Sequence, residues 1–251
     1  MRSERFPTIA AAILAGGKAT RYGGAAKGLL RLPDGTTIVE RLLQVLARAD
    51  ISDIVICAND SVPYAHLGLR IIPDAVADAG PLGGIAAALR HFAGNPHPSF
   101  PSPSLERGCP KDRGETGRYD GVLVVPCDMP AISEREIGAL VAAFAGRVAQ
   151  ASACQACASV MQAKACGTAQ ACATAPLVVA ATGGGEMQPL CAVLRTDVLD
   201  AVLGALASPD RGVGRLWRKL GAGIVMFSDP APFVNVNTPA DLAAWIEANR
   251  V

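Results

Sequence analysis

The chain of 251 residues has few aromatic side chains, no excess of charge of either sign and no long uninterrupted apolar run. Because only 4% of its residues are aromatic while 51% are hydrophobic, its core must be mainly aliphatic. The 23 basic and 22 acidic residues nearly cancel, which argues against a nucleic-acid-binding surface. No apolar run approaches the ~20 residues that cross a membrane, so we expect no membrane span.

The beginning of the chain and its cysteines bear on the compartment. Residues 1–5 include the acidic Glu4, and the apolar run that follows is short, which is unlike a secretory signal peptide. We therefore expect a cytoplasmic protein. In that compartment the eight cysteines are expected to be free thiols.

Two common nucleotide-binding motifs, the P-loop and the G-x-G-x-x-G turn, are missing from the first glycine-rich loop. This loop spans residues 14–27 and follows an apolar run. The backbone N–H groups of Gly16 and Gly17 can lie directly against a phosphate, and Arg21 and Lys27 add positive charge. The loop predicts a site for a polyanion such as a nucleoside triphosphate. The alternative is a glycine-rich turn with two solvated cations.

Apolar strand-like runs alternate with helical patterns along the chain. Strands are predicted at Ile9–Leu14, Asp53–Cys57, Leu69–Ile72, Gly121–Val125, Leu177–Ala180, Leu190–Leu194 and Gly223–Phe227. Helices are predicted at Ile38–Ala49, Leu82–Phe92, Glu134–Phe144, Asp197–Ala207 and Pro239–Asn249. The alternation predicts an α/β fold whose parallel or mixed sheet is covered on both faces.

Two helix starts are marked clearly in the sequence. Ser133 and Glu136 have the spacing of a capping box, and Thr238 precedes Pro239 as an N-cap precedes proline at the first helical position. Both helices follow motifs that end in polar residues, which places those motifs at strand ends. In open α/β sheets, ligands bind outside the carboxyl ends of the strands.

Two segments break the strand and helix pattern. Residues 94–118 are rich in proline and serine and then charged, and residues 146–175 are a low-complexity tract of alanine, glutamine and cysteine. We interpret both as flexible insertions in a single domain that spans residues 1–251, and we expect neither to contribute to the core.

The second insertion also raises the question of zinc. Its cysteines are Cys154, Cys157, Cys166 and Cys172, and the first pair has the spacing of zinc ligands. The tract is rich in alanine and lacks turn-forming residues between most of these cysteines. We therefore do not favour a zinc site.

Asp128 follows a predicted buried strand and lies between Pro126 and Pro130. These prolines favour extended or turning backbone and prevent further strand pairing. A lone carboxylate at this place suits Mg²⁺, which takes one or two protein carboxylates and otherwise phosphates and water. The alternative is an aspartate that caps a turn. We expect the neighbouring Cys127 to pack in the core.

Asp74 is followed closely by the glycine-rich segment Gly80–Gly84 at a helix start. The carboxylate of Asp74 can accept two hydrogen bonds from the edge of a guanine or bind a ribose hydroxyl. The glycines allow the helix N-terminus to approach an anion closely. The alternative is a loop with an ordinary helix start.

Asn235 and Asn237 alternate in an apolar context, so a strand would point both amides to the same side. The alternatives are a binding surface and a ladder of paired amides inside the fold, because buried amides must find partners.

Taken together, these segments resemble the molybdenum cofactor guanylyltransferases over most of the chain outside the two insertions. The matching elements are Leu14-Ala-Gly-Gly17, Arg21, Gly23-Gly24, Lys27, Asp74, Gly80-Pro-Leu-Gly-Gly84, Pro126-Cys-Asp-Met-Pro130, Gln188-Pro189 and Asn235-Val-Asn-Thr-Pro239. Many nucleotidyltransferases share the first loop. The last element is more discriminating, because cytidylyltransferase relatives usually carry carboxylates there.

The resemblance implies a three-layer αβα sandwich, a Rossmann-like nucleotidyltransferase with a mostly parallel mixed sheet. It implies transfer of GMP from GTP to the phosphate of molybdenum-bearing molybdopterin, with Mg²⁺ as cofactor and pyrophosphate as second product. The implied partners are GTP and a molybdopterin-type second substrate. Transient contact with molybdoenzyme apoproteins or cofactor-synthesis proteins is also implied.

The same resemblance implies roles for individual residues. Leu14, Ala15, Gly16, Gly17 and Lys27 would contact GTP, Asp74 its nucleoside, and Asp128 would hold Mg²⁺. Arg21 would face the triphosphate, and Gly80, Gly84, Asn235 and Asn237 would serve the second substrate. Cys57 stands where the family has an amide that helps to bind the nucleotide, and Asn59 is the residue that would replace it.

The residues are consistent with this chemistry without a strong general base. A phosphate monoester is largely ionised at pH 7, because its second pKa is about 6. None of the three histidines lies in a motif. Catalysis would then rest on charge neutralisation and positioning by Arg21, Lys27 and Asp128 with Mg²⁺.

Two alternatives stay open. One is a nucleotidyltransferase that uses CTP or acts on a sugar or alcohol phosphate. The other is an idle nucleotide-binding module on the same fold. The intact Arg21, Lys27 and Asp128 argue against the idle module, because a degenerate copy loses its charges first.

Overall fold

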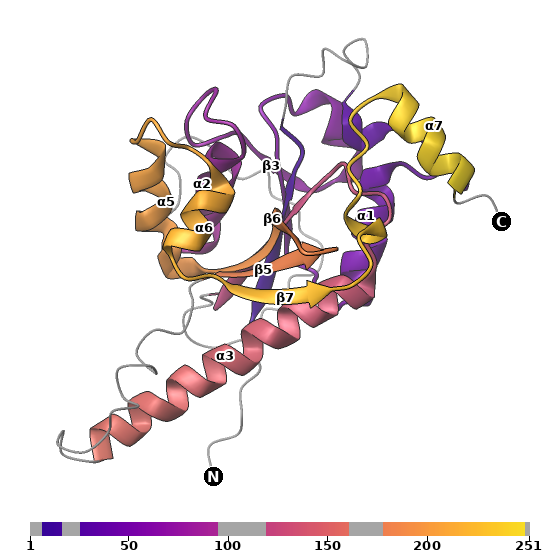
Figure 1. The fold of residues 1–251 in the computed structure, drawn as a ribbon. Coiled ribbons are helices and arrows are strands. Elements are labelled where there is room, and N and C mark those ends of the chain that lie inside the picture. The colour runs from indigo at the N-terminus through magenta and orange to yellow at the C-terminus, as the bar shows by residue number, and fades with distance from the viewer. Residues whose placement is uncertain (1–6, 17–25, 95–118, 161–177, 249–251) are drawn as a thin grey trace.

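The computed structural model of the protein describes residues 7–16, 26–94, 119–160 and 178–248. The described residues build a seven-stranded sheet with helices on both faces (Figure 1). The strands are β1 (Ile9–Leu14), β2 (Ile54–Cys57), β3 (Arg70–Ile72), β4 (Gly121–Pro126), β5 (Val178–Gly183), β6 (Glu186–Arg195) and β7 (Gly223–Phe227). The α-helices are α1 (Ile38–Arg48), α2 (Pro81–Phe92), α3 (Glu134–Val160), α5 (Leu199–Leu206), α6 (Val213–Lys219) and α7 (Pro239–Ala248). Short 3₁₀ helices are η2 (Lys27–Leu29), η3 (Val62–Leu67), η4 (Thr196–Val198) and η5 (Ala231–Phe233).

The strand order is β3-β2-β1-β4-β6-β5-β7. Neighbouring strands are parallel except that β6 runs antiparallel to both β4 and β5. The carboxyl ends of β1, β2 and β4 are level, because Leu14 is opposite both Cys57 and Pro126. The loops after these strands therefore emerge at one edge of the sheet. The mostly parallel mixed sheet predicted from the sequence is confirmed.

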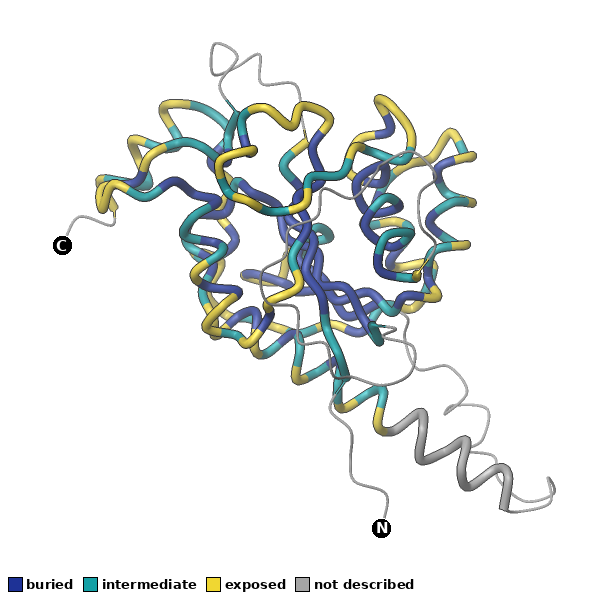
Figure 2. The backbone as a smooth tube through the Cα atoms, turned by 180° about the vertical axis from the view of Figure 1, so that it is seen from behind, coloured by how far each residue is buried: buried dark blue, intermediate teal, exposed yellow. Residues whose placement is uncertain are grey.

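The two faces of the sheet carry separate cores. Along β1, Ala10 and Ala12 belong to a buried cluster with α2, α5 and α6, whereas Ala11 and Ile13 belong to a second cluster with α1 and α3. This alternation follows from the two-residue period of a strand. Figure 2 shows the strands as the buried centre of the molecule, with helices on either side. The three layers are thus helix, sheet and helix.

The predicted helix starts at Ser133 and Thr238 are confirmed. The Ser133 backbone N–H donates to Glu136 Oε2 at 3.1 Å, and the Arg135 N–H donates to Ser133 Oγ at 3.2 Å. The N–H of Asp241 donates to Thr238 Oγ1 at 3.1 Å. These bonds satisfy N-terminal amide groups that have no partner within their own helix.

Helix α3 is longer than the sequence pattern predicts, since it ends at Val160 and not at Phe144. Alanine and glutamine are strong helix formers, so the low-complexity composition favours continuation of the helix. Val148 packs against the core, which corrects the expectation that residues 146–175 lie wholly outside it. Figure 1 shows the far end of α3 extending beyond the sheet.

The remaining questions about the two insertions concern residues outside the described ranges or side chains of α3 beyond Ala149. The flexibility of residues 95–118 and the proposed absence of zinc therefore stay predictions. Within the described residues, no helix combines the length and the apolarity that a membrane crossing requires.

Helix α6 and the segment around Asn235 also differ from the sequence analysis. The seven residues of α6 were missed because Gly212 and Gly214 obscure a short helical pattern around the buried Trp217.

Residues 234–237 form no strand of the sheet. The Val236 N–H donates to Asp128 O in the loop after β4 at 2.8 Å, and Asn235 is exposed to solvent. The buried amide ladder is therefore wrong.

Candidate functional site

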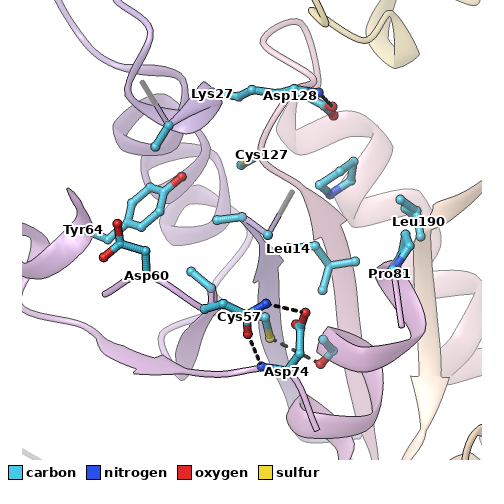
Figure 3. A pocket seen from close by; sticks show the side chains of 18 of the residues that line it. Leu14, Lys27, Cys57, Asp60, Tyr64, Asp74, Pro81, Cys127, Asp128 and Leu190 are labelled. Atoms are coloured by element: carbon cyan, nitrogen blue, oxygen red, sulfur yellow. Dashed lines mark hydrogen bonds and ion pairs between the residues drawn. The ribbon is translucent and has the colours of Figure 1, made fainter. Parts of the chain in front are cut away.

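A pocket of about 800 Å³ opens at the carboxyl ends of β1, β2 and β4. It is lined by Leu14, Ala15, Gly16, Ala26, Lys27, Cys57, Ala58, Asn59, Asp60, Pro63, Tyr64, Asp74, Asp78, Gly80, Pro81, Gly84, Pro126, Cys127, Asp128 and Leu190. Figure 3 shows Lys27 and Asp128 together at one end of this pocket and Asp74 at the other, with Leu14 between them. The motifs around Lys27, Asp74 and Asp128 thus meet in one site.

Hydrogen bonds between the loops hold this edge of the sheet together. The Ala15 N–H donates to Cys57 O at 2.9 Å, and the Cys127 N–H donates to Leu14 O at 3.1 Å. These bonds continue the parallel ladder one residue beyond the strands. The backbone next to the pocket is therefore as firmly paired as the sheet itself.

Lys27 and Asp128 form the charged end of the pocket. Lys27 begins η2, and its Nζ lies 3.5 Å from Asp128 Oδ2 and donates a hydrogen bond of 2.7 Å to Asn237 Oδ1. The two charged side chains are 27% and 19% exposed, so water screens them less than it screens a surface pair. The lysine is held in place while it remains accessible from the pocket.

Asp128 carries an incompletely compensated negative charge. Its Oδ1 atom is buried and accepts no hydrogen bond within the described part of the chain. Burial raises the pKa of Asp128, and the neighbouring Lys27 opposes this effect. A buried carboxylate oxygen without a donor is costly unless a cation reaches it. Oδ1 is therefore well suited to a divalent cation.

The surroundings of Asp128 favour a particular kind of metal. Among the described residues, no group of three or more His, Cys, Asp or Glu side chains could enclose an ion. Zn²⁺ in a structural site needs four protein ligands, whereas Mg²⁺ is held by one or two carboxylates and completed by phosphates and water. The residues present fit Mg²⁺ bound together with a phosphate ligand.

The segment before α7 supports this charged end of the pocket. The Asn237 side chain accepts from Lys27, and its backbone N–H donates to Asp241 Oδ2 at 2.8 Å. The hydrogen bond from the Asn237 N–H, and after it the one from the Thr238 side chain, lowers the pKa of Asp241. Val236 is buried and bonds to the backbone of Asp128. Asn237 therefore reaches the site through Lys27, whereas Asn235 does not line the pocket.

Asp74 forms the opposite end of the pocket together with Asn59. The Asn59 Nδ2 group donates to Asp74 Oδ2 at 2.9 Å, and the Asp74 backbone N–H donates to Asn59 Oδ1 at 2.9 Å. Two loops that follow different strands are thus joined by a reciprocal pair of bonds. The dashed lines at Asp74 in Figure 3 mark this pair.

Glycines make room for the Asp74 side chain. A Cβ atom at Gly84 would lie 3.3 Å from Asp74 Oδ1 and 3.1 Å from Leu14 Cδ2. At Gly83 it would lie 2.9 Å from Val76 O, so a larger residue there would displace backbone. Gly80 precedes α2 with a φ of 63°, a conformation that glycine adopts without strain. The glycine-rich segment therefore seats Asp74 against the start of α2.

Sequence reasoning missed the wall of the pocket that Tyr64 builds. Tyr64 is buried, and a Cβ at Gly28 would lie 3.1 Å from its hydroxyl and 3.3 Å from Cys127 Cβ. Burial raises the pKa of Tyr64, and it raises the pKa of Cys127 to about 12. Cys127 packs in the core as predicted. No local motif marks Tyr64, because its role depends on a contact with Gly28, which is distant in the sequence.

Most of the site residues that the sequence predicts line the pocket. The structure brings together in the pocket Leu14, Ala15, Gly16, Lys27, Asn59, Asp74, Gly80, Gly84 and Asp128. Gly17 and Arg21 lie outside the described residues. Cys57 lies inside the pocket wall, where its thiol donates to Gly84 O at 3.4 Å, and burial raises its pKa.

The chain is similar to proteins of known sequence and of known structure. A molybdenum cofactor guanylyltransferase of Burkholderia vietnamiensis is 30% identical over 97% of this chain and 98% of its own. One from Shewanella sp. strain MR-4 is 27% identical over 92% and 91%. The molybdopterin-guanine dinucleotide biosynthesis protein A of Archaeoglobus fulgidus has a TM-score of 0.59 at 18% identity, over 95% and 97% of the two chains.

A protein of Mycobacterium tuberculosis solved in complex with manganese has the same fold, with a TM-score of 0.52 at 16% identity over 96% and 99% of the chains. The two solved structures therefore share the fold of this chain. Residues 11–224 match the family of MobA-like NTP transferase domains, a range that begins within β1 and ends at the second residue of β7. On this match and on the full-length similarity to its relatives, the chain belongs to the MobA-like NTP transferase family.

Proposed function

We propose that the protein transfers GMP from GTP to the terminal phosphate of a molybdenum-bearing molybdopterin, forming the guanine dinucleotide form of the cofactor. An oxygen of the acceptor phosphate forms a bond to the α-phosphorus of GTP. The bond from this phosphorus to the oxygen that bridges to the β-phosphate breaks, and pyrophosphate leaves with that electron pair. No covalent intermediate on the protein is required.

The observation that carries this proposal is the pairing of Lys27 with the partly buried Asp128 at the carboxyl end of β4. Nucleotidyl transfer requires positive charge beside the triphosphate and a carboxylate that can share a cation with it. Asp128 offers a free oxygen, and Lys27 lies beside it. The guanylyltransferase names of relatives that match nearly the whole chain support guanine and the molybdopterin acceptor.

Asp128 would hold the Mg²⁺ through Oδ1. When bound, Mg²⁺ neutralises charge on the α-phosphate and on the departing pyrophosphate. Lys27, which now donates to Asn237, would turn its ammonium group to the phosphates. Gly16 lines the pocket, and we propose that its backbone N–H contacts the phosphates together with Gly17 and Arg21.

The acceptor needs no general base from the protein. Its phosphate is already largely ionised at pH 7, with a second pKa of about 6. Of the described histidines, His66 and His91 are absent from the pocket lining. On this proposal the protein contributes position and charge, because it holds the two reacting phosphates side by side.

The second substrate would bind near the charged end of the pocket. We propose that it approaches past Gly80 and the segment of Asn235 and Asn237. The contact between Asn237 and Lys27 gives this segment an effect on catalysis without a direct bond to the substrate. Gly84 lies against Asp74, so we propose that it faces the nucleoside part of GTP and not the second substrate.

The choice of base tests the proposal. Guanine presents N1–H and N2–H₂ donors that one carboxylate, Asp74, can accept together, whereas adenine and cytosine present no such pair. Leaving a carboxylate without these donors costs roughly 1–3 kcal/mol, or about 5- to 150-fold in affinity. We expect GTP to bind most tightly when GTP, CTP, ATP and UTP are titrated with and without Mg²⁺. Equal or tighter binding of CTP would support a cytidylyltransferase.

A further inference from the structure

We infer that Asn59 is a positioning residue for base recognition: it fixes the carboxylate of Asp74 and acts on the nucleotide through it. This inference rests on the proposed function, because it assigns to Asp74 the reading of the guanine edge. It differs from the role predicted from the sequence, in which Asn59 contacts GTP itself.

The geometry of the pair carries the inference. One donor and one acceptor of the Asn59 amide are both committed to the same residue, to Asp74 Oδ2 and to the Asp74 backbone N–H, at 2.9 Å each. A planar amide bonded at both ends has one orientation. The Asn59 amide therefore fixes both the backbone and the side chain of Asp74. Because the two residues lie fifteen positions apart, this contact depends on the fold and is not part of a local turn.

The remaining oxygen of Asp74 is left for a ligand. Within the described residues, Asp74 Oδ1 accepts no hydrogen bond, and it lies near both Gly16 and Gly84. A Cβ at Gly16 would still be 3.9 Å away from it, so the approach from the pocket is open. Each carboxylate oxygen has two lone pairs, so Oδ2 can also accept a second bond. Asp74 can thus accept two donors from a base while Asn59 holds it.

Fixing the carboxylate matters because two donors must be met at once. A carboxylate that rotates freely can follow a single N–H group, but it meets N1–H and N2–H₂ together only in one plane. Asn59 is exposed to solvent and makes no contribution to the buried core. Its amide is therefore expected to affect how well the base is discriminated more than how stably the protein folds.

A double-mutant cycle with GTP and ITP tests this role. Hypoxanthine, the base of ITP, keeps N1–H but lacks the N2 amino group, so the GTP-to-ITP affinity ratio reports the second bond alone. A hydrogen bond to a charged group predicts a ratio of about 10 or more in the parent protein. We expect Asn59→Ala to lower this ratio several-fold, and Asp74→Ala to bring it close to 1.

The decisive comparison is Asn59→Ala in the Asp74→Ala background. If Asn59 acts through Asp74, the second substitution changes GTP affinity by less than about twofold, since coupled residues are not additive. Full additivity would show that Asn59 contacts the nucleotide directly and would overturn the inference. Equal weakening of GTP and ITP in Asn59→Ala would also overturn it, because that result indicates a merely structural role.

Two further variants sharpen the test. Asn59→Asp is isosteric but puts an acceptor where the amide donates to Asp74 Oδ2, so we expect it to lose selectivity as Asn59→Ala does. Thr36→Ala is the matched control, because it removes the 2.7 Å bond that the Thr36 hydroxyl donates to Asp34 Oδ1 in a loop that does not line the pocket. It should leave both affinities unchanged. A parent protein that prefers another nucleotide to GTP would refute the proposed function instead.

Discussion

Replacing Asp128 with asparagine is expected to reduce the rate of nucleotidyl transfer on the order of 10³-fold while GTP binding falls only modestly. The substitution removes one negative charge at Oδ1, a buried oxygen with no donor among the described residues, and is expected to weaken the proposed cation site. The phosphates would remain in contact with the first loop and Lys27. Single-turnover rates and GTP titrations, each in the presence of Mg²⁺, measure the two effects separately.

The variant should fold, because burial disfavours the charged form of Asp128 and asparagine carries no charge. Its melting temperature is expected to be no lower than that of the parent, which separates lost chemistry from lost structure. Lys27→Ala should behave differently and weaken GTP binding as well, since its ammonium contacts the ground-state triphosphate. Asp200→Asn, on the exposed side of α5, is the matched control for charge. Turnover by Asp128→Asn within tenfold of the parent would place the metal elsewhere.

Replacing Trp217 with alanine is expected to destabilise the protein by about 3–5 kcal/mol. Trp217 is fully buried on the face of the sheet covered by α2, α5 and α6, and its Nε1–H donates to Pro189 O at 2.7 Å. The substitution removes the largest side chain of this core and leaves the Pro189 carbonyl unpaired. Because 1 kcal/mol corresponds to roughly 2–4 °C in a domain of this size, the melting temperature should fall by about 6–20 °C.

Trp217→Phe separates packing from hydrogen bonding. It retains most of the ring but not the N–H donor, so the loss is expected to be smaller, about 1–3 kcal/mol for the unpaired carbonyl. Both variants are measured by thermal unfolding with and without GTP. A melting temperature of Trp217→Ala within 2 °C of the parent, a margin set by the same roughly 2–4 °C per kcal/mol, would mean that α6 packs on the sheet through other contacts.

The strands and the site motifs could be predicted because their signals are local. β1 and β7 have the predicted bounds, since fully apolar runs that stop at polar or glycine residues are short and unambiguous. The position of Asp74 and Asp128 at one edge of the sheet follows from the rule that parallel strands end together. These predictions needed no knowledge of long-range contacts.

The features of the site that could not be predicted from the sequence depend on contacts between distant segments. Asn237 bonds to Lys27, 210 positions away, and Asn59 bonds to Asp74 across two strands. Neither pair has a periodic or compositional signal. The close approach of Tyr64 to Gly28 is also a contact between distant segments. The need for glycine at position 28 can be recognised only when the position of Tyr64 is known. The predicted end of helix α3 was too early for a different reason. The low-complexity composition of the segment concealed its strong helix propensity.

The central claim is that this chain joins GMP to a molybdopterin phosphate, and pyrophosphate release measures that step directly. Purified protein is incubated with Mg²⁺, molybdenum-bearing molybdopterin and each of the four nucleoside triphosphates in turn. We expect pyrophosphate to form with GTP, in proportion to the acceptor, and a guanine dinucleotide to appear in equal amount. Release that is fastest with CTP, or that does not depend on the acceptor, would contradict the account.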